Sequence, residues 1–141
     1  MKIKGKTILI TGAGGGIGKS LVQSFIEKGA VKIYAADLNI ENLKILKDQY
    51  ENKIIPIKLD VTQQKDIKYC SHKCEDIDIL VNNAGVELAV PLLNKNSLKA
   101  AKIEMDVNFL GIHSLCVAFW DVLKKKESSS IINILSIASF I

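Results

Sequence analysis

The chain has 141 residues, of which 48% are hydrophobic and 24% are charged, and its formal net charge is +4. This composition is that of one globular domain with a sizeable core, and it excludes a disordered or low-complexity chain. All 19 basic residues are lysines spread along the chain, and the absence of arginine argues against a nucleic-acid partner.

Short β-rich runs alternate with helical patterns along the whole chain. Strands are expected at Thr7–Ile10, Lys32–Ala36, Ile54–Leu59, Ile77–Val81 and Ile131–Leu135. Helical patterns lie near Ile17–Lys28, Ile40–Tyr50, Gln63–His72 and Ser97–Lys126, the last of which is expected to form two helices. This alternation predicts an α/β fold, a doubly wound Rossmann-type parallel sheet with helices on both faces that ends after the fifth strand. The whole chain, 1–141, is expected to be one nucleotide-binding domain.

The only apolar stretch near membrane length is Met105–Leu123. Polar residues interrupt it, including Asp106 and His113, so a buried helix is favoured over a membrane span. The apolar run at the N-terminus is too short for a signal peptide.

The chain has three cysteines, Cys70, Cys74 and Cys116. Cys70 and Cys74 have a spacing that suits zinc, but the second half of a four-ligand site is missing, so no metal is expected. Reduced thiols favour a cytoplasmic protein.

The segment T-G-A-G-G-G-I-G at 11–18 joins the first expected strand to the first expected helix. A glycine turn of this kind presents backbone N–H groups and the positive end of a helix dipole to a phosphate. Gly12, Gly16 and Gly18 have the spacing of a dinucleotide-binding turn. Residues 13–20 also resemble a P-loop whose first glycine is replaced by Ala13. A purely structural turn is the third interpretation.

Polar or small residues follow each of the five expected strands, namely 11–18, Asp37, 60–62, 82–85 and Ser136. Ligands of an open parallel sheet bind at the carboxyl ends of its strands, so these segments are expected to meet in one crevice.

Asp37 stands about 20 residues after the glycine turn, where a carboxylate binds the ribose hydroxyls of NAD. It would repel the 2′-phosphate of NADP, and Gly15 and Leu38 bring no positive charge, so NAD is the expected cofactor. Alternatively, Asp37 is a turn or N-cap residue before the helix near Ile40. The P-loop interpretation could use Asp60 or Asp37 for Mg²⁺, but it leaves residues 82–85 without a role.

With these motifs the sequence resembles the N-terminal portion of a short-chain dehydrogenase/reductase. The matching segments are 11–18, Asp37, L-D-V-T at 59–62, V-N-N-A-G at 81–85, V-N-F-L-G at 107–111 and I-I-N-I-L-S at 131–136. The cofactor residues expected from the motifs and the resemblance are Gly12, Gly14, Gly15, Gly16, Ile17, Gly18, Asp37, Leu38, Asp60, Val61, Asn83, Ala84 and Gly85. Of these, the resemblance places Asp60 and Val61 at the adenine, and it gives Asn82 the task of fixing the central strands.

The resemblance further implies hydride transfer between nicotinamide and a small alcohol or carbonyl substrate. Asn108 would hold a water of the proton relay, and Ser136 would bind the substrate oxygen. The family's Tyr-x-x-x-Lys acid/base pair follows that serine, whereas the sequence ends at Ile141. The pair Tyr69 and Lys73 has the same spacing, but it lies on a peripheral helix and is assigned no catalytic role.

Three expectations follow from this interpretation. The 141 residues alone bind NAD with little or no turnover, which leaves a non-catalytic NAD-binding module as the alternative. The strand at 131–135 forms an apolar sheet edge that promotes self-association or homo-oligomer formation. Residues 87–93 border the substrate pocket.

Overall fold

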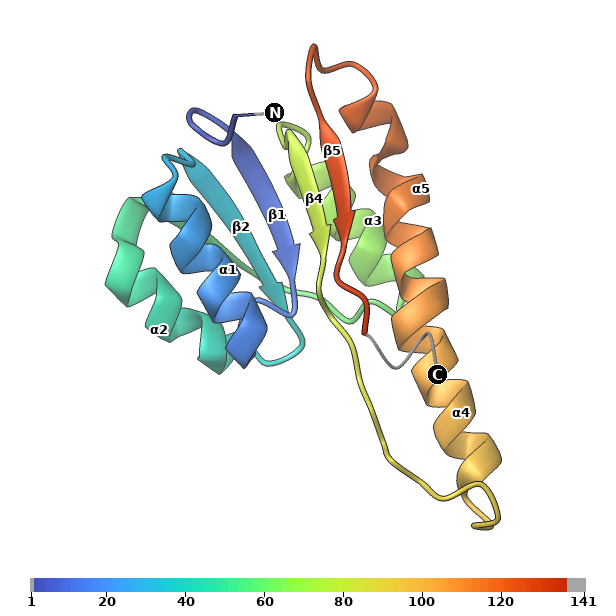
Figure 1. The fold of residues 1–141 in the computed structure, drawn as a ribbon. Coiled ribbons are helices and arrows are strands. Elements are labelled where there is room, and N and C mark those ends of the chain that lie inside the picture. Colours follow the sequence, from blue (N-terminus) through green and yellow to red (C-terminus); the bar gives the residue numbers. More distant parts are fainter. Residues whose placement is uncertain (1, 137–141) are drawn as a thin grey trace.

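Five parallel strands form one sheet in the computed structural model, which describes residues 2–136 (Figure 1). The strands are β1 (Thr7–Thr11), β2 (Lys32–Asp37), β3 (Ile54–Lys58), β4 (Ile79–Asn82) and β5 (Ser130–Asn133). Their order in the sheet is β3-β2-β1-β4-β5. The chain adds β2 and β3 on one side of β1 and then crosses over to add β4 and β5 on the other side. The predicted doubly wound parallel sheet is confirmed.

β1 is the central strand, and all five of its residues are buried. Leu9 lies opposite Tyr34 of β2 and opposite Leu80 of β4 in the strand register. An apolar strand of this kind fits the centre of a parallel sheet, because helices cover both of its faces.

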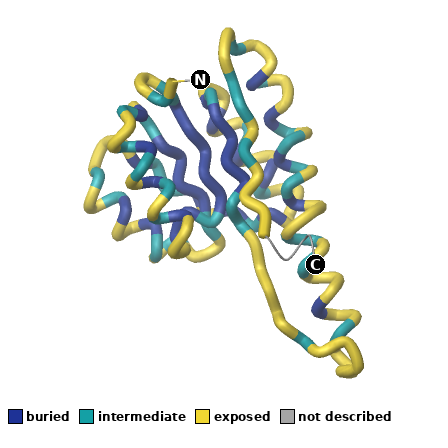
Figure 2. The backbone as a smooth tube through the Cα atoms, in the orientation of Figure 1, coloured by how far each residue is buried: buried dark blue, intermediate teal, exposed yellow. Residues whose placement is uncertain are grey.

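The helices divide between the two faces of the sheet (Figure 2). They are α1 (Gly16–Glu27), α2 (Ile40–Tyr50), α3 (Gln64–Lys73), α4 (Ser97–Met105) and α5 (Ile112–Leu123), with a short 3₁₀ turn η1 at Glu51–Lys53 and a π-helical segment η2 at Asp106–Gly111. Buried side chains of α1 and α2 pack on one face, and those of α3 and α5 pack on the other.

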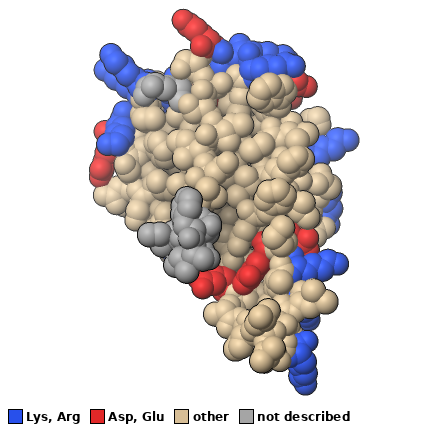
Figure 3. Space-filling view, turned by 45° about the vertical axis from the view of Figure 1, so that its right-hand side comes forward, with Lys and Arg blue, Asp and Glu red and all other residues tan. Residues whose placement is uncertain are grey.

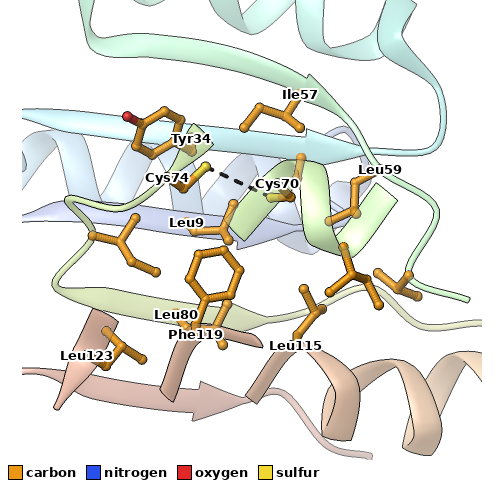
Figure 4. Packing of buried hydrophobic residues seen from close by; sticks show 14 residues of the cluster. Leu9, Tyr34, Ile57, Leu59, Cys70, Cys74, Leu80, Leu115, Phe119 and Leu123 are labelled. Carbon is orange, nitrogen blue, oxygen red and sulfur yellow. Dashed lines mark hydrogen bonds between the residues drawn. The ribbon is translucent and has the colours of Figure 1, made fainter. Parts of the chain in front are cut away.

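The core under α3 and α5 is closely packed (Figure 4). Phe119 and Leu115 of α5 are buried beside Leu80 of β4 and Cys70 of α3. Full burial of one such Phe or Leu side chain stabilises a fold by roughly 1.5–3 kcal/mol.

The last helical region differs from the prediction of two helices. Residues 97–123 form one continuous helical run, whose middle is the π-helical segment η2 rather than a break. Nor is the run simply buried. By length and composition alone, it is long and apolar enough to cross a membrane. Only 22% of its most apolar 18-residue stretch is buried inside the protein. One stripe, with Leu115, Phe119 and Leu123, packs in the core, while the opposite side faces outward.

β4 begins two residues later than its predicted start at Ile77. The N–H of Ile77 donates to the carbonyl of Cys74 over 3.4 Å, and this turn ends the α3 region. The N–H of Asp78 donates to the carbonyl of Thr7, while Asp78 Oδ2 accepts the N–H of Thr7. These bonds fix the start of β4 against β1.

Candidate functional site

A cleft of about 400 Å³ opens at the carboxyl ends of the strands. Its lining is Thr11, Gly12, Gly15, Gly16, Ile17, Gly18, Ala36, Asp37, Leu38, Leu59, Asp60, Val61, Asn83, Ala84, Gly85, Val86 and Val107. Twelve of the thirteen residues predicted to bind a cofactor are in this lining, and Gly14 is the exception. The ends of β1, β2, β3 and β4 therefore converge on one hollow, as predicted, whereas Ser136 after β5, which was expected there too, is not among the residues that line it.

Two glycines of the turn are required by the packing of the protein itself. Gly12 has a positive φ of 63°, and a Cβ there would lie 2.9 Å from Cα of Ala84. A Cβ on Gly18 would lie 2.1 Å from the carbonyl oxygen of Gly12. Any side chain at Gly18 would therefore push α1 away from the end of β1.

Gly16 has a different environment, because a Cβ there would meet no atom within 4 Å. It is the first residue of α1, which begins at the N-cap Gly15 without a side-chain hydrogen bond and has no acidic residue in its first turn. The first N–H groups of a helix lack intrahelical partners and attract anions. The open space at Gly16 thus adjoins a part of the cleft that suits a phosphate.

Asp37 does not cap the helix that follows it, because Asn39 is the N-cap of α2 and accepts the N–H of Glu41. Each carboxylate oxygen of Asp37 accepts one backbone N–H over 2.9 Å, Oδ2 from Gly14 and Oδ1 from Asn39. A carboxylate oxygen can accept more than one hydrogen bond. Asp37 is therefore held in place at the cleft wall with acceptor capacity for a ligand.

Gly14 supports Asp37 rather than lining the cleft. A Cβ at Gly14 would lie 2.7 Å from Cβ of Asn42 and 3.0 Å from Oδ2 of Asp37. Its missing side chain lets the turn approach the carboxylate closely enough for the hydrogen bond.

Thr11 and Asn83 join the ends of β1 and β4. The buried Thr11 hydroxyl accepts the N–H groups of Asn83 and Ala84, each over 3.0 Å, and donates to the carbonyl of Val81. In return, Asn83 Nδ2 donates to the carbonyls of Thr11 and Gly12. These bonds make the floor of the cleft rigid.

Asn82 connects β4 to its neighbours, as predicted. Its Nδ2 donates to Oδ1 of Asn133 in β5 over 2.8 Å and also contacts Sγ of Cys116 in α5 over 3.6 Å. The side chain is 1% exposed, so this bond ties β4 to β5 in the interior.

Asp60 and Val61 form the wall beyond β3. Asp60 Oδ1 accepts from both the N–H and the hydroxyl of Thr62, which shapes the turn before α3. Val61 packs against Gly111 of η2, where a Cβ would lie 2.9 Å from Val61 Cγ2. Gly111 belongs to a motif found in the sequence, but only the fold reveals this contact.

Asn108, in η2, uses both ends of its side-chain amide on one residue. Its Oδ1 accepts the N–H of Val86 over 2.9 Å, and its Nδ2 donates to the carbonyl of Val86 over 2.8 Å. Since Val86 lines the cleft, Asn108 fixes part of the cleft wall. Its role in a water relay stays a prediction.

Ser136 follows β5 and is exposed. β5 runs parallel to β4, so Ser136, which follows β5, lies on the same carboxyl-end side of the sheet as Asn83 and Gly85, which follow β4. Its catalytic role also stays a prediction. Tyr69 and Lys73 lie on the exposed side of α3, where Lys73 Nζ donates to the Tyr69 hydroxyl over 3.2 Å.

Cys70 and Cys74 are both fully buried, with their Sγ atoms 3.9 Å apart. The hydrogen bond with Cys70, together with burial, raises the pKa of the Cys74 thiol far above its ordinary value. Both thiols are free, as is Cys116. Within residues 2–136, no three His, Cys, Asp or Glu side chains gather as metal ligands would.

Sequence reasoning missed four parts of the lining: Ala36, Leu59, Val86 and Val107. Ala36 and Leu59 end or follow strands, so the strand-end rule could have included them. Val86 directly follows the motif at 81–85, and Val107 begins the motif at 107–111, although it lies in a helical segment rather than at a strand end.

The sequence profile of the short chain dehydrogenase family matches residues 6–141. The chain belongs to the short-chain dehydrogenase family. This membership excludes the P-loop interpretation of residues 13–20, and it agrees with the sheet order and the position of the cleft. Members of this family are oxidoreductases.

Several relatives and solved structures of this family resemble the chain. An NADP-dependent 3-hydroxy acid dehydrogenase of Schizosaccharomyces pombe is 33% identical over 145 residues, which cover 97% of this chain and 56% of that protein. A short-chain dehydrogenase from Burkholderia cenocepacia in complex with NADP is 33% identical, with a TM-score of 0.90 over 100% of this chain and 57% of its own. A member from Burkholderia phymatum in complex with NAD is 26% identical, with a TM-score of 0.90 over 100% and 52%. The chain thus spans little more than half the length of these proteins.

Proposed function

We propose that this short-chain dehydrogenase binds NAD, and that its cleft serves hydride transfer between the nicotinamide and a small alcohol or carbonyl substrate. The observation that carries the proposal is the pairing of Gly16 with Asp37. Gly16 leaves open space at the start of α1, and Asp37 is fixed by two backbone N–H groups on the neighbouring strand. These are the parts that a dinucleotide requires for its pyrophosphate and its ribose.

The strand order supports a direction for the bound cofactor. The adenine would lie by Asp60 and Val61 beyond β3, and its ribose would bind Asp37 beyond β2. The pyrophosphate would meet the first turn of α1, beyond β1. The nicotinamide half would then extend past Gly85 and Val86 beyond β4, toward Ser136 beyond β5.

The choice of NAD over NADP rests on charge. Several similar proteins are NADP-dependent by name or bind NADP, and another binds NAD, so relatives alone do not decide it. Among the described residues that line the cleft there is no lysine to pair with a 2′-phosphate, and Asp37 would repel that group. This argument favours NAD.

In the reaction, bound NAD would accept or supply the hydride. The Ser136 hydroxyl is proposed to bind the substrate oxygen, and Asn108 is proposed to serve the proton relay. The printed sequence contains no Tyr-x-x-x-Lys pair after Ser136. In this family the tyrosine of that pair is the general acid/base, and it needs the lysine beside it, because the pKa of an unperturbed tyrosine is near 10. We therefore propose that the 141 residues alone bind NAD with little turnover, as a nucleotide-binding module would.

Titration of the purified chain with NADH and NADPH tests the cofactor. We expect NADH to bind at least about tenfold more tightly, because one close charge repulsion is worth about 1.4 kcal/mol or more. The variant Asp37→Ser should narrow or reverse that preference, while Asp48→Ser, on the outer side of α2, should leave it unchanged. Equal affinities of the unaltered chain for both cofactors would contradict the choice of NAD, and binding of neither would contradict the proposal.

Two further expectations are proposals as well. The buried Cys70 and Cys74, which are free thiols rather than a disulfide, support a reducing, cytoplasmic environment. The apolar edge of β5 and the outer side of α5 support self-association, because Val117 and Trp120 are 64% and 60% exposed there.

A further inference from the structure

The segment after β4 runs away from the sheet beside the helical run 97–123, in the opposite direction (Figure 1). Two helix side chains hold its backbone. Asn108 forms its two hydrogen bonds with Val86, and Glu104 Oε1 accepts the N–H of Leu88 over 2.7 Å. Within residues 2–136 no strand pairs with this segment, so these side-chain bonds take the place of the backbone hydrogen bonds of a sheet.

The spacing of the two helix residues explains why both bonds can form. Residues four apart on a helix lie on one face and differ in height by about 6 Å. Residues two apart in an extended chain point the same way and lie about 6.6 Å apart. Because the helix and the segment run antiparallel, Glu104 lies level with Leu88 while Asn108 lies level with Val86. The two spacings therefore agree, and both contacts can form at once.

We infer that Glu104 is a positioning residue for the nicotinamide half of the cleft. Asn108 alone fixes Val86 at one point, about which the segment could still pivot. The hydrogen bond between Leu88 and Glu104 fixes the segment at a second point, which prevents this rotation and holds Val86 in the cleft wall. Beyond Leu88 the support ends, because Ala89 has a positive φ of 48° that turns the chain out of its extended path.

Glu104 acts here as a hydrogen-bond acceptor. Its partner is a backbone N–H over 2.7 Å, and among residues 2–136 no lysine forms an ion pair with it. A neutral acceptor of the same shape should therefore serve in its place. The inference rests on the proposed function for its effect on NAD, whereas its effect on the segment does not.

The test compares Glu104→Ala with Glu104→Gln, whose amide oxygen can still accept the Leu88 N–H. Hydrogen exchange of the Leu88 amide is followed by NMR in the ligand-free chain, and dissociation constants are measured for NADH and for ADP-ribose, which lacks the nicotinamide. We expect Glu104→Ala to speed the Leu88 exchange about tenfold and to weaken NADH binding several-fold, since the hydrogen bond that Leu88 N–H donates is lost. ADP-ribose affinity should stay unchanged, and Glu104→Gln should resemble the unaltered chain in all three measurements.

Glu41→Ala is the matched control, because it removes an exposed helix carboxylate whose ion pair is with Lys44 on the same helix, α2. It should change none of the three readouts. The inference is overturned if Glu104→Ala leaves Leu88 exchange unaltered, if Glu104→Gln behaves like Glu104→Ala, or if NADH and ADP-ribose weaken together. If the unaltered chain does not bind NADH, the proposed function fails, while the exchange measurement still decides whether Glu104 holds the segment.

Discussion

At the scale of single residues, the glycines of the turn at 11–18 have different surroundings and therefore different roles, which the sequence alone does not distinguish. Gly12 and Gly18 are enforced by contacts within the protein, and Gly14 by its approach to Asp37. Gly16 has open space around it, so the protein's own packing does not require a glycine there. A ligand that needs close access to the backbone explains its presence.

This difference predicts opposite effects of two alanine substitutions. Gly16→Ala should keep the free energy of unfolding or raise it by about 0.5–1 kcal/mol, because alanine suits a helix better than glycine. It should also reduce NADH affinity strongly. Gly18→Ala should lower the free energy of unfolding by about 2 kcal/mol or more, because its methyl group overlaps the Gly12 carbonyl.

Urea unfolding and NADH titration of both variants provide the measurements. A Gly16→Ala chain that binds NADH as tightly as the unaltered chain would remove the main support for the proposed phosphate site. A Gly18→Ala chain of unchanged stability would show that α1 can shift to admit the methyl group.

Residue types and spacing were enough to predict the lining of the cleft but not the bonds behind it. The sequence left two interpretations of Asp37 open, a cofactor ligand or a turn or cap residue. The structure excludes the cap, because Asn39 takes that position, but Asp37 Oδ1 does accept the N–H of Asn39 in the turn before α2. For Asn108 the resemblance implied a relay, which stays a prediction. The structure adds that both ends of its side chain bind Val86, a contact between residues 22 positions apart that no local pattern encodes.

At the scale of elements, a polar cluster at the base of the sheet fastens β2 to the loop between α3 and β4. Asp76 accepts hydrogen bonds from Lys32 and from the Tyr34 hydroxyl, and Lys32 also lies over the Tyr34 ring. Lys126, beyond α5, donates to the Asp76 carbonyl over 2.9 Å. The cluster lies at the end of the sheet opposite the cleft, so its task is stability rather than binding.

The pKa values of the cluster reflect these bonds. The hydrogen bond with Asp76 raises the pKa of Lys32, and burial, with the bond to Asp76, raises the pKa of Tyr34. Burial opposes ionisation of Asp76, but its bonds with Lys32 and Tyr34 outweigh that effect and lower its pKa. The stabilisation from Asp76 is therefore present above its unfolded pKa and is lost as pH falls through the lower folded pKa.

We accordingly expect Asp76→Asn to reduce the free energy of unfolding by about 1 kcal/mol near pH 7, the usual worth of such partly exposed bonds. The difference from the unaltered chain should shrink below about pH 4, where the aspartate becomes protonated. Urea unfolding between pH 3 and pH 7 measures the free energy of unfolding of both chains. Asp48→Asn, at an exposed position of α2, is the control. A difference that does not depend on pH would contradict this account.

The helical run 97–123 shows where element prediction from sequence was limited. Its apolar periodicity predicted helix correctly, but two helices were expected where the structure has one continuous helical run. The structure accommodates Asp106 and Asn108 in the π-helical segment η2 instead, without interrupting the helix. Contact of Val61 with Gly111 and of Val86 with Asn108 occurs at this segment, and both depend on distant parts of the chain.

At the scale of the whole molecule, charge and apolar surface are unevenly distributed. Figure 3, turned to bring the side of α4 and α5 forward, shows a broad central surface without lysine, aspartate or glutamate and with charged groups around its margin. Phe109, Val117 and Trp120 are each more than half exposed, and Ile131 of the edge strand β5 is 36% exposed. Surfaces of this kind associate with other surfaces in water.

We expect the purified chain to self-associate through this face, with a second copy as its partner. Light scattering after size-exclusion chromatography should give a mass above that of one chain, increasing with concentration. Ile131→Lys should shift the chain toward the monomer, because a charge on an edge strand opposes pairing. Ile45→Lys, on the opposite side of the sheet, should not. A monomer at high concentration in the unaltered chain would contradict the expectation.

The sequence by itself determined the fold class, the family and the set of residues that meet at the cleft. It could do so because strand periodicity and the residues at strand ends are local properties, and because parallel strands bring their carboxyl ends to one edge. Only the tertiary structure decided which glycines serve packing and which leave room for a ligand. It also decided that Glu104 and Asn108 hold the segment after β4, because these contacts join residues that are distant in sequence and depend on how a helix and an extended chain lie side by side.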